Sequence, residues 1–75
     1  MDTLRDGTIR VTWTDLGRPE GKGYASLPSG GKLLLDDADM NYATKYLEAG
    51  YEPAFFVRRS EALQGHYVVV SRVRA

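Results

Sequence analysis

Residues 36–50 read Asp-Asp-Ala-Asp-Met-Asn-Tyr-Ala-Thr-Lys-Tyr-Leu-Glu-Ala-Gly, and they predict a helix. The acidic residues at the start suit a helix N-terminus, where unpaired amide groups and the helix dipole favour negative charge. Met40, Ala43 and Leu47 follow at helical spacing, so we expect them to form the buried face. Gly50 readily adopts the left-handed conformation that ends many helices, and a proline follows soon after it.

Three segments before this helix have the features of strands or of their connections. Residues 8–14 alternate polar and apolar side chains, which predicts a half-buried strand with Trp13 facing the core. Residues 15–23 are rich in glycine and charge and predict an exposed connection, and residues 24–27 predict a second strand. Residues 32–35 fit either a third strand or the lead-in to the helix, and the pattern does not separate the two.

Two further strands are expected after the helix. Residues 54–59 are aromatic and apolar before they turn cationic, and residues 66–74 form the longest strand-like run. Apolar residues occur on both faces of that run, as in a central strand covered on both sides at one end. The order predicts a single α+β domain over residues 1–75, a small antiparallel sheet of four or five strands with one helix packed on a face, in the order β-β-(β)-α-β-β.

Composition restricts the class of protein. The 75 residues carry ten cationic and ten acidic side chains, a net charge of zero, which argues against a general nucleic-acid coat or a membrane-surface peptide. The absence of cysteine excludes disulfides and thiolate metal sites. No apolar run approaches the length of a membrane span, and the first residues lack the features of a signal peptide. We therefore expect a soluble, cytoplasmic domain without a membrane partner.

Two motifs invite a phosphate or metal interpretation, and neither is complete. Residues 17–23 place two glycines before a lysine, but the spacing is short for a phosphate-binding loop and the following hydroxyl residue is missing. Four oxygen-bearing residues fall at ligand positions of an EF-hand register: Asp37, Asp39, Asn41 and Glu48. Tyr42 stands where that loop requires glycine, and helix capping explains the acids equally well. The sequence therefore predicts no metal and no cofactor.

Catalytic residues are also sparse. His66 is the sole histidine, and no serine lies near it in sequence in the manner of a nucleophile motif. A chain of this size also has little material with which to enclose a substrate pocket. We therefore expect a protein that is not an enzyme and has no catalytic residues.

The cationic residues are distributed unevenly. Residues 51–75 have a net charge of +2, contributed by arginines near the ends of the last two expected strands. We predict that this region, with one tyrosine as an aromatic contact, binds a partner: Arg58, Arg59, Arg72, Arg74 and Tyr67. Pairing about the connection at residues 60–65 would set Arg58 near Tyr67 and not near Arg72. One cluster of all four arginines would therefore need a neighbouring strand or a second subunit.

These features predict a non-catalytic interaction or regulatory protein that binds a partner protein through its surface. It would be of the accessory or inhibitor kind found in phages and mobile elements, and a homodimer is one form that this hypothesis allows. A second hypothesis is a nucleic-acid-binding module that uses the arginine-rich C-terminal strand pair. A third, weaker one is a small-ligand binder or minimal enzyme centred on His66.

Overall fold

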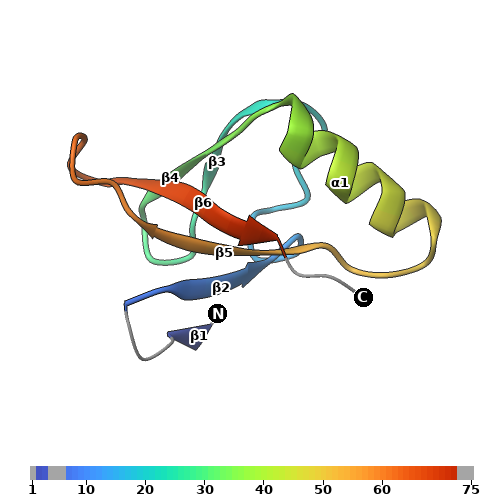
Figure 1. Ribbon diagram of the computed structural model, residues 1–75, viewed down its shortest axis with the longest axis horizontal. Helices are drawn as coiled ribbons and strands as arrows, with labels where there is room; N and C mark the ends of the chain where they lie inside the picture. Colours follow the sequence, from blue (N-terminus) through green and yellow to red (C-terminus); the bar gives the residue numbers. More distant parts are fainter. Residues whose placement is uncertain (1, 4–6, 73–75) are drawn as a thin grey trace.

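The computed structural model describes residues 2–3 and 7–72 and contains one six-stranded sheet and one helix (Figure 1). The elements are β1 (Asp2–Thr3), β2 (Ile9–Thr12), β3 (Gly23–Ser26), β4 (Lys32–Leu35), α1 (Asp37–Glu48), β5 (Ala54–Arg59) and β6 (His66–Arg72). The expected α+β class is confirmed. Residues 32–35, for which the sequence left two possibilities, form a strand.

The sheet has the strand order β1-β2-β5-β6-β4-β3. The sequence predicted a fully antiparallel sheet, and this is wrong for one pair, because β4 and β6 run parallel. The chain reverses once across α1 and again in the turn between β5 and β6, so β6 runs in the same direction as β4. Figure 1 shows α1 beside the sheet, near the end of β6 that lies opposite this turn.

Both predicted ends of the helix are confirmed. Asp36 is the N-cap: its Oδ1 accepts a hydrogen bond from the Asp39 amide at 2.9 Å, and the Asp36 amide donates to Asp39 Oδ2 at 3.1 Å. This reciprocal pair is a capping box with aspartate in the position usually taken by glutamate. At the other end Gly50 has φ 86°, and the Tyr51 amide donates to the Tyr46 carbonyl at 2.8 Å.

The hydrophobic core lies on one face of the curled sheet, the inner face, beneath α1 and the turn that follows β2. The predicted inward position of Trp13 is confirmed, and its ring lies 6.2 Å from that of Phe55. The buried core cluster is Val11, Trp13, Leu16, Ala25, Leu27, Leu33, Leu35, Ala43, Phe55, Val57 and Tyr67. Most of its members come from strands, and α1 contributes only Ala43 to the fully buried set.

The buried face of α1 differs from the prediction. Ala43 is buried and Met40 packs against the core, but Leu47, predicted to be buried, is 49% exposed. Tyr42 lies against Phe55 at 5.3 Å between ring centroids, and its hydroxyl donates to the Ala54 carbonyl at 2.8 Å. The ring of Tyr42 fills the space between α1 and the sheet. The side of α1 that faces the core is therefore rotated away from Leu47.

Strand β6 departs from simple alternation. Val57 pairs with Val69 but Phe56 pairs with Ser71, so Val70 is an extra residue in a β-bulge. The bulge shifts the alternation by one residue and brings Arg72 opposite Phe55, on the inner face. Val68 and Val70 are exposed, which corrects the expectation that this strand is covered on both sides.

We expect Leu47→Ala to change the free energy of unfolding by less than about 0.5 kcal/mol, because Leu47 lies at the surface. Phe55→Ala, which empties a fully buried position, should cost about 3–5 kcal/mol. Urea denaturation followed by Trp13 fluorescence measures both variants. A comparable loss in the two variants would contradict the position of the helix.

Candidate interaction surface

The structure separates the arginines that were predicted to act together. Arg58 pairs with Val68 and Arg59 with Tyr67, close to the turn between β5 and β6, as the sequence-based pairing anticipated. Arg72 lies at the other end of β6, about 16 Å from Tyr67 at roughly 3.3 Å per residue. Arg74 lies outside the described residues. The three described arginines therefore do not form one cluster within a single chain.

Arg72 has an internal partner. Its Nε and Nη2 both lie 2.9 Å from Oδ1 of Asp39, a residue of α1 that is only 3% exposed. The remaining Asp39 oxygen accepts from the Asp36 amide in the capping box. This arrangement satisfies a buried carboxylate and joins the start of α1 to the end of β6, so it explains Arg72 as a structural residue.

The two aspartates of this network have opposite pKa shifts. Burial raises the pKa of the Asp39 carboxyl, and the Asp36 carboxylate adds to the rise. The hydrogen bonds from the Asp36 amide and from Arg72 oppose it. The hydrogen bond from the Asp39 amide lowers the pKa of the Asp36 carboxyl. The capping acids identified in the sequence thus have defined roles at the helix start.

Tyr67 was predicted to contact a partner, and the structure instead places it in the core, 9% exposed. Its ring lies so close to Gly31 that a Cβ on this glycine would come within 2.3 Å of Tyr67 Cε1. Gly31 is therefore the residue that gives the ring of Tyr67 its space beside the start of β4.

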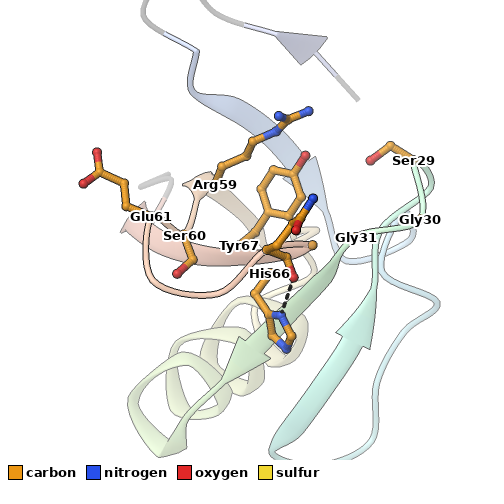
Figure 2. Close-up of a pocket in the computed structure, with 10 residues that line it drawn as sticks. Ser29, Gly30, Gly31, Arg59, Ser60, Glu61, His66 and Tyr67 are labelled. Atoms are coloured by element: carbon orange, nitrogen blue, oxygen red, sulfur yellow. Dashed lines mark hydrogen bonds between the residues drawn. The ribbon is translucent and has the colours of Figure 1, made fainter.

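A polar pocket of about 600 Å³ lies at the turn end of β5 and β6 (Figure 2). Figure 2 shows Arg59 and Glu61 extending in different directions, and the ring of His66 turned away from the Tyr67 hydroxyl. His66 Nδ1 lies 3.2 Å from the Gln64 carbonyl, and Ser60 Oγ accepts from the Ala62 and Leu63 amides.

The groups around the polar pocket do not converge on one point. Among the described residues that line it, no hydroxyl is hydrogen-bonded to His66. The arrangement therefore lacks the nucleophile and base pair of a hydrolytic site. The pocket provides one cationic side chain, Arg59, and its other polar groups belong mainly to turn residues.

The opposite face of the sheet carries the largest group of exposed apolar side chains on the strands. We call the following four residues the outer patch: Tyr24, Leu34, Val68 and Val70, exposed by 60%, 51%, 47% and 49%. Tyr24 pairs with Leu34 across β3 and β4. Leu34 and Val68 follow the paired residues Leu33 and Tyr67 on β4 and β6, and both line the groove between these strands. The outer patch therefore spans three neighbouring strands.

The outer patch borders a groove where the sheet splits. Strands β4 and β6 pair only at Lys32–His66 and Leu33–Tyr67, and beyond this point they diverge. The resulting groove of about 280 Å³ is lined by Leu34, Val68 and Val70, with Asp39 and Arg72 at its helix end. Its volume is close to the lower limit of small-molecule pockets, about 300 Å³, which suits a single anchoring side chain of a partner.

Three cationic residues share the outer face with the outer patch, and one of them, Arg58, pairs directly with Val68. Arg10, Lys32 and Arg58 each neighbour a buried residue on their strand, so alternation directs them to the outer face. Arg58 also donates through Nε to Thr8 Oγ1 at 2.8 Å. These three residues, which we call the cationic rim, include Arg58 from the predicted site and two residues that the sequence reasoning did not select.

The signal for the outer patch was present in the sequence but was interpreted differently. Leu34 stands between two leucines that are both buried, and a run of three leucines does not show which one faces outward. Val68 and Val70 share one face of their strand by simple alternation, and that face was expected to be covered. Only the position of α1 on the opposite face shows that it is open.

Comparison with known proteins identifies no relative. No protein family matches the chain, and no curated protein or solved structure shows significant similarity to it. The helix formed by the described residues lacks the length and apolar character needed to cross a membrane. Within residues 2–3 and 7–72, histidine and acidic side chains form no group that could hold a metal ion.

Gly31→Ala should destabilise the protein by about 1–3 kcal/mol, because the added methyl group meets the buried ring of Tyr67. Gly21→Ala is the matched control: its Cβ would have nothing within 4 Å, so the change should be neutral or slightly stabilising. Thermal and urea unfolding of both variants test this. Equal stability of the two would show that Tyr67 does not occupy this position.

Arg72→Met should cost about 1–3 kcal/mol at neutral pH, because the buried Asp39 carboxylate loses its partner. Without Arg72, the pKa of Asp39 rises further above its unfolded value. A carboxyl whose pKa is higher in the folded than in the unfolded protein stabilises the folded state at low pH, where it is protonated. At a pH where the carboxyl ionises, it destabilises the folded state. The loss should therefore be larger at about pH 7 than at about pH 4.

The control for this variant is Arg59→Met, the same substitution at an exposed position of β5, which should cost less than about 0.5 kcal/mol at either pH. Urea unfolding at the two pH values, with an NMR titration of the Asp39 carboxyl, gives the comparison. A loss that is equal at both pH values would contradict the role assigned to Asp39.

Proposed function

We propose that this chain is a non-catalytic interaction protein that binds a partner protein through the outer patch. The observation that supports this most directly is the group of four apolar side chains, each about half exposed, on three adjacent strands. Exposed apolar side chains are common singly, whereas a continuous patch bordered by polar residues is typical of a binding surface.

The chemistry of the outer patch favours protein over nucleic acid. Three of its four members are aliphatic and offer no ring on which bases stack, and Tyr24 already makes an edge contact with His66 at 5.5 Å. The net charge of zero provides little long-range attraction for a phosphate backbone. The nucleic-acid hypothesis is therefore the second candidate, supported by the cationic rim alone.

An enzymatic role has less support. Ser60 and His66 in the polar pocket are engaged in local turn contacts, and they show no mutual geometry that suits acid–base or nucleophilic chemistry. A binding role uses the surface that the fold exposes and requires no further group.

Partner capture compares the tagged wild type with two double variants in lysate of the host cells. Leu34→Gln with Val68→Thr makes the outer patch polar, and Val68→Thr keeps a β-branched residue in the strand. Leu47→Gln with Leu63→Gln is the matched control, since these leucines are 49% and 54% exposed on other elements. We expect a partner that binds wild type and control but is weakened at least about tenfold by the outer-patch variant.

Two results would contradict the proposal. One is an outer-patch variant that retains every partner captured by the wild type, and the other is a control that loses the same partners to the same extent. Salt-dependent binding of mixed-sequence single-stranded DNA or RNA, lost in the outer-patch variant, would favour the second candidate.

A further inference from the structure

We infer that the partner of the outer patch is a protein segment that combines aliphatic side chains with flanking carboxylates. This inference rests on the proposed function and specifies the chemistry of the partner. Its basis is the separation of charge between strands β2 to β6 and the rest of the fold, which the net charge of zero conceals.

The strands from β2 to β6 contain no aspartate or glutamate. They contain five cationic residues: Arg10, Lys32, Arg58, Arg59 and Arg72. The described acids lie in α1, in the connections and in the edge strand β1, where Asp2 pairs with Arg10 of β2. Several of the acids in the connections are already engaged. Asp15 Oδ2 accepts from the Thr12 amide, and Glu52 accepts from the amide and hydroxyl of Thr14.

Two acids, Asp36 and Asp39, line the groove beside the outer patch at its helix end. Asp36 caps α1, and Asp39 is paired with Arg72, so both carboxylates already have partners within the fold. Lys32 is exposed on the outer face, and the described residues supply no salt bridge to it. Lys32 is therefore positioned to meet the negative charge of a partner.

The same charges disfavour a second copy of this chain as the occupant. A face-to-face dimer about a two-fold axis would bring the cationic rims of both copies to one interface. Like charges brought together at an interface cost several kcal/mol. The apolar area and the rim are both accommodated when the partner supplies carboxylates around an aliphatic centre.

The experiment uses defined peptides and the full chain labelled with ¹⁵N. The first is the blocked peptide Glu-Glu-Leu-Val-Leu-Val-Glu-Glu, and the second replaces its glutamates by lysine. The third keeps the glutamates but has Ser-Thr-Ser-Thr at its centre, and oligo-deoxythymidine represents nucleic acid. Amide shifts of Leu34, Val68 and Val70 report binding at the outer patch, and sedimentation reports the oligomeric state.

We expect the first peptide to shift these amides and to bind at least about tenfold more tightly than the lysine peptide at low salt. The difference in affinity between the glutamate and lysine peptides should decrease at about 300 mM salt, because salt screens partly exposed charges. Lys32→Glu should reduce or reverse the preference, whereas Lys45→Glu, the same change of charge on α1, should leave it unchanged. The chain alone should sediment as a monomer.

The outcomes separate this inference from the proposed function. Equal binding of the glutamate and lysine peptides at the outer patch would overturn the acidic partner but retain a protein-binding face. No shift at the outer patch with either aliphatic peptide would count against both. Equal binding of the Ser-Thr peptide, tighter binding of oligo-deoxythymidine, or a dimer through the outer patch would each overturn the inference.

Discussion

The ion pair between Arg72 and Asp39 determines how the helix α1 meets the sheet. Asp39 belongs to the capping box that starts α1, and Arg72 ends β6, so one buried carboxylate fixes the helix start against the sheet. The β-bulge at Val70 is what turns Arg72 to the inner face. With Arg72 directed inward, the exposed valines of β6 remain on the face that α1 does not cover.

This dependence shows which features the sequence could and could not reveal. The helix ends at residues 36 and 50 follow from local chemistry, because caps use side chains and backbone groups a few residues apart. The strands over residues 54–59 and 66–72 also follow from local patterns. The bulge follows from no such pattern, since a run of three valines reads the same whether one of them is extra or not.

The candidate site was harder to predict for the same reason. Arg58 and Arg72 have similar sequence contexts, at the cationic ends of two strands, yet one borders the outer patch and the other joins the helix to the sheet. Tyr67 appeared available for contacts, but Gly31 leaves space for its ring in the core. Burial of a side chain depends on which elements cover which face, and this is a property of the tertiary arrangement.

The central position of the β5–β6 hairpin has a consequence for how the chain folds. β2 pairs with β5, and β4 pairs with β6, so the earlier strands find their neighbours in the last segment of the sheet to be synthesised. Until residues 54–72 emerge from the ribosome, β2 lacks the neighbour with which it forms its longer ladder. The local pairs β1–β2 and β3–β4 can form earlier, but they join into one sheet only through the β5–β6 hairpin.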